Sequence, residues 1–205
     1  MYMAAIGHVH GNLPALTAVL DALDDEGILT VLNTGDSVGG SMSNEIVEVL
    51  RERNVLSVLE EADRRVVHFL RKRATLQKKC SPEEFAALEQ AFESLHPENI
   101  EYLRSLPRSK TYEFEGIHIL LCSGTPSNPA GTLSEDDSED MFRRQREIAN
   151  ADIIIGGGTH DAYARTVDGT LFVSPGACGQ EHIATYALID TEVQPWTVRF
   201  CETKY

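Results

Sequence analysis

Short apolar runs alternate with amphipathic stretches through the first third of the chain. Met3–Gly7 and Leu29–Leu32 are apolar runs typical of buried strands, whereas Leu13–Leu23 repeats apolar residues every three or four positions, as a helix does. Asn44–Arg53 is a second helical segment, and Val55–Leu59 is a third strand. Because strands and helices alternate, this part predicts a parallel sheet with right-handed crossover connections.

The middle of the chain is predicted to be helical, and the last part mainly consists of strands. A long helix is expected over Ala62–Gln77, a second begins at the capping box Ser81-Pro82-Glu83-Glu84, and a third covers Pro97–Leu106. The later segments comprise one acidic helix, Glu139–Ala149, and the strands Lys110–Phe114, Ile117–Leu121, Ile153–Ile155, Thr170–Val173, Ile183–Asp190 and Thr197–Glu202. The pattern predicts a two-layered α/β sandwich, parallel in its first half and increasingly antiparallel in its second.

Length and composition favour a single domain over residues 1–205, because 205 residues with 42% hydrophobic content can bury a substantial core. No apolar run approaches the roughly 20 residues of a membrane helix. The chain enters its first strand almost at once, so a signal peptide is not expected. Its four cysteines are widely spread, which favours free thiols in a reducing compartment and predicts a cytoplasmic protein.

The net charge of −14 argues against nucleic acid or an anionic membrane as a partner, since both would be repelled. The acidic run Glu135–Asp140 is interpreted as a solvated loop and helix start, because it lacks the spacing and central glycine of a calcium-binding EF-hand. The basic face of the predicted helix Ala62–Gln77 is interpreted as a solvated surface for the same electrostatic reason.

The segment His8-Val9-His10 follows the first apolar run and carries the strongest chemical signal. Residues two apart on an extended segment project to the same side, so both imidazoles can face one metal ion. The bland alternative is a pair of strand-end histidines satisfied by hydrogen bonds. Asn12 is a plausible N-cap of the next helix, with Pro14 in its first turn.

Further loops of the same kind follow other strands. Gly35-Asp36 ends the second strand with a carboxylate, Ser123 follows a later strand, and Thr159-His160 follows a run of three glycines. Glycines at strand ends allow a close approach of the backbone to a ligand. Parallel strands place such loops at one sheet edge, where α/β folds bind their ligands.

Taken in order, these loops resemble those of the calcineurin-like metallophosphoesterase superfamily, particularly its small single-domain bacterial and archaeal members. The family pattern is Asp-x-His, Gly-Asp, Gly-Asn-His, a lone His and Gly-His-x-His, each at a strand end. The matching segments are Ile6–Asn12, Thr34–Asp36, Leu120–Pro126, Gly156–His160 and Ser174–Gly179. The resemblance runs from Ala4 to about Glu202. It implies a four-layer fold in which helices flank a sandwich of two mixed sheets.

The resemblance also implies a ligand set. The family uses two metal ions about 4 Å apart to activate a water for in-line attack on phosphorus. The ligands of the first metal fall on four residues that can all ligate, namely His8, His10, Asp36 and His160, with His8 standing where the family has an aspartate. The second metal keeps Asp36, but its other ligand positions fall on Glu61, Ser123 and Gly158. The catalytic histidine falls on Ala62, while the aspartate after it is kept as Asp63.

We therefore expect one divalent metal ion. Three neutral imidazoles and one carboxylate suit zinc best, while iron or manganese is allowed by the same ligands. Glu61 is either a weak second-site ligand with Asp36, a general base, or an exposed carboxylate at a helix start. Asn12, Ser123 and Thr159 are candidate substrate-binding residues, although strand closure is the commoner explanation for Ser123 and Thr159, and Asn12 first serves as a helix cap.

Two functions follow from this expectation. The first is a metallophosphoesterase-like hydrolase of phosphate esters, reduced to one metal, that binds a small phosphorylated molecule or phosphate. The second is a catalytically inactive pseudo-phosphoesterase that keeps the fold and the metal for a binding or regulatory role. A remote third is redox chemistry at iron or manganese.

Overall fold

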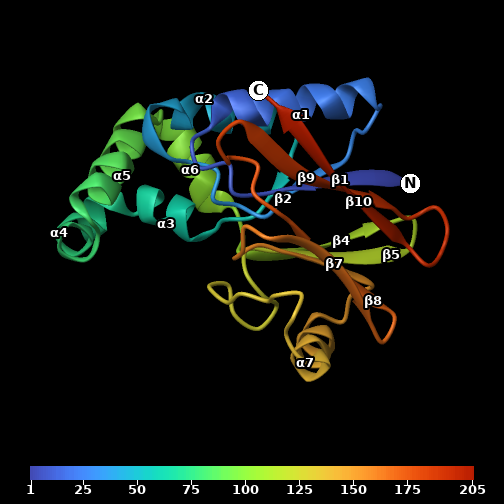
Figure 1. The fold of residues 1–205 in the computed structure, drawn as a ribbon. Helices are drawn as coiled ribbons and strands as arrows, with labels where there is room; N and C mark the ends of the chain where they lie inside the picture. The colour runs from blue at the N-terminus through green and yellow to red at the C-terminus, as the bar shows by residue number, and fades with distance from the viewer.

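Two five-stranded sheets stacked face to face occupy the centre of the computed structural model, which describes all 205 residues (Figure 1). The first sheet has the order β10-β9-β1-β2-β3, with β1 at Tyr2–Ile6, β2 at Val31–Asn33, β3 at Leu56–Ser57, β9 at Ile183–Asp190 and β10 at Thr197–Lys204. The second has the order β4-β5-β6-β8-β7, with β4 at Ser109–Phe114, β5 at Ile117–Cys122, β6 at Ile153–Gly156, β7 at Ala162–Val167 and β8 at Thr170–Pro175.

Helices cover both outer faces of this sandwich (Figure 1). α1 (Leu13–Asp25) and α2 (Ser43–Glu52) pack on the first sheet, and α7 (Glu139–Ala149) packs on the second. A lateral group of helices lies beside the sheets, comprising α3 (Glu61–Val67), α4 (Phe69–Lys79), α5 (Pro82–Ser94) and α6 (Pro97–Ser105), with a short 3-10 helix, η1 (Gly40–Met42), next to it. The predicted sandwich of mixed sheets between helices is confirmed. None of these helices has the length and apolar content needed to cross a membrane.

Strand β1 shows why apolar and polar residues do not alternate along the first apolar run. Met3 and Ala5 face the second sheet and pack in the cluster that contains Ile119 and Ile155. Ala4 and Ile6 face outward into the cluster formed with α1 and α2. A strand covered on both faces must be apolar at every position, as is usual for parallel sheets.

Strand direction decides where the loops meet. β1, β2 and β3 run parallel, and so do β5, β6 and β8, whereas β4, β7, β9 and β10 each pair antiparallel with a neighbour. The loops that follow the parallel strands come together at one edge of the sandwich, and backbone hydrogen bonds join them there. α3, one of the lateral helices, lies against that edge, where its Asp63 carboxylate accepts hydrogen bonds from the loop after β2.

Two elements differ from the sequence prediction. The helix expected over Ala62–Gln77 is broken at His68, where φ is −106° and ψ is 11°, so that α4 takes a new direction. The break lets the Phe69 ring pack on two aromatic rings of α5, those of Phe85 and Phe92. Strand β7 was not predicted, because its sequence, AYARTV, has no apolar run.

The loop after β1 is joined to the loop after β2 by three backbone hydrogen bonds. The N–H groups of His8, His10 and Gly11 donate to the carbonyls of Gly35, Asp36 and Ser37 at 2.9, 2.9 and 3.0 Å. Gly11 has φ +83°, and a Cβ there would lie 1.7 Å from the Gly39 carbonyl oxygen. Only glycine allows this approach of the two loops.

We therefore expect Gly11→Ala to destabilise the protein far more than Gly169→Ala. Gly169 has nearly the same φ, +84°, but nothing lies within 4 Å of its added Cβ, so the control suffers only the conformational strain, about 1–2 kcal/mol. Gly11→Ala must also separate the two loops. Thermal unfolding of both variants measures the difference, and equal melting temperatures would contradict the close approach described here.

Candidate metal centre

Three loops deliver the histidines and the aspartate singled out in the sequence. His8 and His10 come from the loop after β1, Asp36 from the loop after β2, and His160 from the loop after β6. The backbone hydrogen bonds between the first two loops place His8 and His10 against Asp36. The parallel strand order therefore brings together residues that are up to 152 positions apart in the sequence.

The three histidines form one cluster. Nε2 of His10 lies 3.2 Å from Nε2 of His160, and the ring centres of His8 and His160 are 4.6 Å apart. One nitrogen of each of the three rings lies within 4.8 Å of one nitrogen of the others. His8 is buried, whereas His10 and His160 reach the surface, so the cluster opens toward solvent on one side.

Asp36 belongs to a second group, together with a residue that the sequence did not single out. Oδ2 of Asp36 lies 3.8 Å from Nδ1 of His8, and Oδ1 accepts a 2.7 Å hydrogen bond from the Ala62 N–H. The carboxylate of Glu60 joins them, with one ligand atom each from His8, Asp36 and Glu60 within 4.8 Å of the others. The candidate ligands thus form two triads that share His8.

Glu60 lies directly before Glu61, the residue aligned with the family's asparagine ligand. One sequence signal could have found it: like Asp36, it is a carboxylate shortly after a strand of the first sheet. The neighbouring glycines leave room for it. A Cβ on Gly35 would lie 2.6 Å from the Glu60 Cβ, and a Cβ on Gly157 would lie 2.8 Å from Glu60 Oε2.

Backbone strain marks the same positions. His8, His10 and Asp36 have φ values of 52°, 49° and 51°, in the left-handed region that costs a non-glycine residue about 1–2 kcal/mol. Residues in this conformation persist where the surrounding structure holds them, and they cluster at functional sites. Here the hydrogen-bonded loops hold all three.

Burial favours the neutral form of His8 and His10. Burial, followed by the charges of His160 and His10, lowers the pKa of His8 to about 3. Burial also lowers the pKa of His10, against the attraction of Asp36. Neither ring nitrogen of the buried His8 makes a hydrogen bond. Neutral imidazoles with free nitrogens are the form that ligates a metal ion.

The carboxyl groups show the opposite shift. Burial, with the charges of Asp36 and Asp63, raises the pKa of Glu60 to about 9, and Oε2 of Glu60 has no hydrogen-bond partner. Burial also raises the pKa of Asp36. Asp63 has a structural role instead, since it accepts hydrogen bonds from the N–H groups of Asp36, Ser37 and Val38 at 2.8–3.0 Å. The site therefore holds several buried carboxyl groups close together. A bound cation would favour their ionised form.

Arginines on the same helix hold the Glu61 carboxylate. Its carboxylate accepts two hydrogen bonds from Arg64, at 2.8 and 2.9 Å, and a longer one from Arg65. Burial alone would raise the pKa of Glu61, but these hydrogen bonds and the arginine charges outweigh it and lower the pKa. A carboxylate held this way is a weaker base than a free one.

The three candidate substrate-binding residues make local hydrogen bonds. Asn12 caps α1 through Ala15 N–H, at 3.2 Å, and donates to the Tyr205 hydroxyl. The Ser123 hydroxyl donates to the Pro129 carbonyl, and the Thr159 hydroxyl donates to Asp161. Asn12 thus joins the start of α1 to the end of the chain, whereas Ser123 and Thr159 bond within their own loops.

The position of the family's second-metal histidine is closed to any side chain. Gly158 has φ +83°, and a Cβ there would lie 2.5 Å from the Gly131 carbonyl oxygen. Ser123, at the position of the other second-metal histidine, is fully buried and too short to replace an imidazole. The donors that remain are concentrated around His8.

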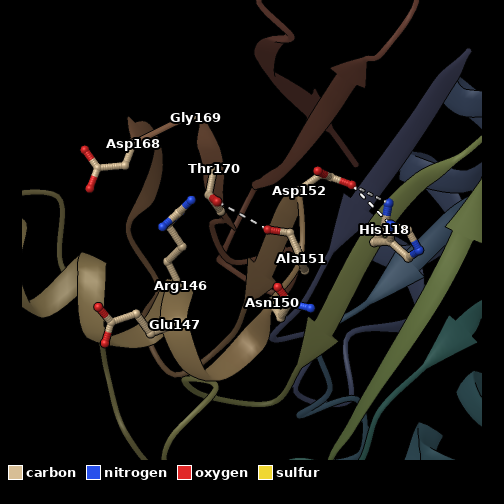
Figure 2. Close-up of a pocket in the computed structure, with 9 residues that line it drawn as sticks. All are labelled: His118, Arg146, Glu147, Asn150, Ala151, Asp152, Asp168, Gly169 and Thr170. Atoms are coloured by element: carbon tan, nitrogen blue, oxygen red, sulfur yellow. Dashed lines mark hydrogen bonds and ion pairs between the residues drawn. The ribbon is translucent and has the colours of Figure 1, made fainter.

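A separate hollow of 530 Å³ lies at the opposite edge of the second sheet, near the amino ends of β5, β6 and β8 (Figure 2). Nδ1 of His118 lies 3.4 Å from Oδ2 of Asp152 there, and Arg146 and Glu147 line the hollow from α7. Its charges are mixed, and it contains none of the candidate ligands. The chemistry of the molecule therefore concentrates at the other edge.

The donor set around His8 fits a divalent metal ion. His8, His10 and His160 offer nitrogen atoms, and Asp36 and Glu60 offer oxygen atoms, all from residues that the loops hold in place. Mixed nitrogen and oxygen donors of this kind suit zinc, iron or manganese.

Comparison with known proteins agrees with this geometry. The family model of the calcineurin-like phosphoesterase superfamily domain matches residues 1–194. An uncharacterized protein of Methanocaldococcus jannaschii is 28% identical over 182 residues, which is 85% of this chain and 68% of that protein.

Two crystal structures superpose over the whole chain. A hypothetical protein from Pyrococcus horikoshii has a TM-score of 0.84 at 25% identity, with 88% of its chain covered. A metallophosphoesterase from Sphaerobacter thermophilus has a TM-score of 0.73 at 24% identity, with 89% covered. The family model, the fold and the ordered loops lead to one conclusion: the chain belongs to the calcineurin-like phosphoesterase superfamily.

Proposed function

We propose that this protein is a metal-dependent hydrolase of phosphate esters whose centre holds a single divalent cation, preferably zinc. The observation that carries the proposal is the environment of His8. Its ring is 3% exposed, and neither ring nitrogen makes a hydrogen bond. His8 belongs to both triads of potential ligands. A buried polar ring without a partner is costly, and a metal ion supplies that partner.

Charge supports the same assignment. Asp36 and Glu60 lie close together, largely shielded from water, and burial lowers the pKa of the nearby His8 and His10. The arrangement therefore lacks positive charge where two carboxylates would repel each other. A divalent ion bound there would balance these carboxylates and act as a Lewis acid on a phosphoryl oxygen.

We propose a single metal ion because the residues at the family's second-metal ligand positions are poor donors in this chain. Gly158 has no room for a side chain, Ser123 is occupied with Pro129, and Glu61 is held by Arg64. His8 adds a neutral ligand where the family has a charged one, which suits a site that needs to hold only one cation. The same donor atoms could also bind iron or manganese.

The substrate we propose is a small phosphorylated molecule. The chain's net charge of −14 opposes long polyanions such as nucleic acid, whereas a single phosphate group can be balanced by the metal and nearby cations.

One observation favours a second candidate function, a metal-binding protein without turnover. Ala62 stands where the family has its catalytic histidine, so no imidazole there can protonate a leaving group. Under this alternative the metal and the fold would serve binding or regulation. Activity measurements separate the two.

The first prediction concerns metal content. Wild type loaded with zinc and desalted should hold one equivalent per chain, measured by inductively coupled plasma mass spectrometry. His10→Gly should lose most of it, because a donor is removed. The φ of 49° at His10 suits glycine, so this variant should fold with a melting temperature close to that of the metal-free wild type. Two tightly held equivalents, or undiminished content in the variant, would contradict the assignment.

The second prediction concerns hydrolysis. Zinc- or manganese-loaded wild type should cleave an aryl phosphate ester, and Asp36→Asn should lower kcat/KM by about a hundredfold or more, in the range seen when one electrostatic group is removed from an active site. Glu93→Gln, an exposed site on α5, serves as the charge-matched control. If wild type and Asp36→Asn share one negligible rate, the alternative without turnover is favoured.

The third prediction concerns pH. The pKa of Glu60 is raised from 4.5 to about 9 in the folded protein, so between these values only the folded state retains the proton. The stability of the metal-free protein should therefore be highest below pH 4.5 with respect to this group and fall as pH rises toward 9. Asp63, whose pKa is raised to about 7, acts in the same direction.

Melting temperatures of the EDTA-treated protein between pH 6 and 9 test this. Glu60→Gln should flatten the decline, because its amide has no proton to lose, whereas Glu93→Gln should leave the decline unchanged. A decline of equal steepness in wild type and Glu60→Gln would show that Glu60 does not titrate as described.

A further inference from the structure

A hollow of 430 Å³ opens beside His10, between the metal centre and the lateral helices. Ala62 and Arg65 of α3 form one side, and Val38, from the loop after β2, lies next to them. Ala87 and Leu88 of α5 form the opposite side. The volume falls within the range of small-molecule sites, and a candidate metal ligand forms part of its wall.

Ala62 and Arg65 are three residues apart on α3, so they share a face of that helix. Both line the hollow, and the Arg65 charge acts on Asp36, whose pKa it lowers against the larger effect of burial. The space vacated by the family's histidine is therefore next to a permanent cation. Arg65 and His10 line the same hollow, so a group bound at His10 would lie in the space that Arg65 borders.

The guanidinium of Arg65 is free to bind a ligand. Glu61 accepts its two short hydrogen bonds from Arg64, whereas Arg65 has only a 3.5 Å contact with it through Nε. The terminal nitrogens of Arg65 donate no hydrogen bond within the protein, and the side chain is 42% exposed. Planar guanidinium groups with two free nitrogens bind phosphate oxygens in a bidentate manner.

We propose that Arg65 binds the phosphoryl group of the substrate, in place of the missing histidine, and that the hollow beside it receives the organic part of the ester. This inference rests on the hydrolase function proposed above. An arginine cannot donate a proton at neutral pH, so it stabilises phosphoryl charge and leaves protonation of the leaving group to solvent. Esters with good leaving groups, such as aryl phosphates, are therefore the favoured class.

The walls of the hollow support a compact, largely apolar organic group. Val38, Ala62, Ala87 and Leu88 present aliphatic surface. The acidic residue on the wall, Glu84, accepts a 2.8 Å hydrogen bond from the Ser81 N–H, which holds its carboxylate at the start of α5. A second charged phosphate is disfavoured beside Glu84, so the geometry favours an ester whose organic group carries no further phosphate.

Binding of inorganic phosphate to the zinc-loaded protein tests Arg65 by isothermal titration calorimetry. Arg65→Ala should weaken the affinity for phosphate by about ten- to a hundredfold, the effect of losing a charge-assisted hydrogen-bonded pair. Arg65→Lys should retain part of it. Arg71→Ala, which removes the same charge from an exposed position on α4 outside the hollow, should bind phosphate as wild type does. Zinc content should be the same in all four proteins.

The outcomes separate this inference from the function on which it rests. Phosphate binding in wild type that is unchanged in Arg65→Ala overturns the assignment of Arg65 and leaves the hydrolase proposal standing. Zinc-loaded wild type that neither binds phosphate nor cleaves an aryl phosphate overturns both. Selective loss of phosphate binding in Arg65→Ala supports the assignment of Arg65, and cleavage of the aryl phosphate by wild type supports the hydrolase function.

A pair of alanines tests the hollow as the site of the organic group. Ala87 lines the hollow, whereas its neighbour Ala86 is equally exposed on α5 but does not. Ala87→Phe should raise KM for the aryl ester by about tenfold, because the ring fills space that the substrate needs. Its affinity for inorganic phosphate should stay unchanged, and Ala86→Phe should alter neither quantity. Equal KM values in the two variants would overturn the placement of the organic group.

Discussion

The backbone ladder between the loops after β1 and β2 is the constraint on which the candidate centre depends. Three N–H groups on the first loop donate to consecutive carbonyls on the second, and the Gly179 N–H holds the His8 carbonyl from the other side at 2.8 Å. This double attachment keeps His8, His10 and Asp36 in left-handed conformations that they would not adopt alone. The loops can approach only because glycines stand at their contacts, most clearly Gly11 against Gly39. Main-chain hydrogen bonds between the loops therefore set the positions of the candidate ligands at this edge.

The second organising feature is a balance between burial and charge. The His8 ring nitrogens and Oε2 of Glu60 lie in the interior without a hydrogen-bond partner. The pKa of His8 falls and that of Glu60 rises for the same reason, since burial disfavours the charged form of each. A centre with neutral nitrogens beside crowded carboxyl groups is suited to a cation. The replacement of an aspartate by His8 and the presence of Glu60 keep both kinds of donor around one location, while Gly158 and Ser123 remove donors from another.

The sequence predicted the limits of helices and strands well wherever apolar residues recur at regular spacing. α7 and β9 have the predicted limits, and β1 and α1 differ by one or two residues at their ends. It failed where packing between distant segments decides the outcome. The helix over Ala62–Gln77 bends at His68 because Phe69 packs on α5, and β7 exists because β8 offers it an edge. Neither cause is visible in the local pattern of hydrophobic residues.

The sequence by itself indicated the family, the mixed-sheet sandwich and the candidate ligands His8, His10, Asp36 and His160, because the alternation of elements and the composition of the loops after the strands are visible in the local pattern of residues. Only the tertiary structure decided what surrounds them. It turned Glu61 toward Arg64, brought Glu60 to His8 and Asp36, closed the position of Gly158 and left Arg65 free beside His10. These outcomes depend on side-chain direction and on contacts across the fold, which adjacent residues such as Glu60 and Glu61 do not reveal by their order in the chain.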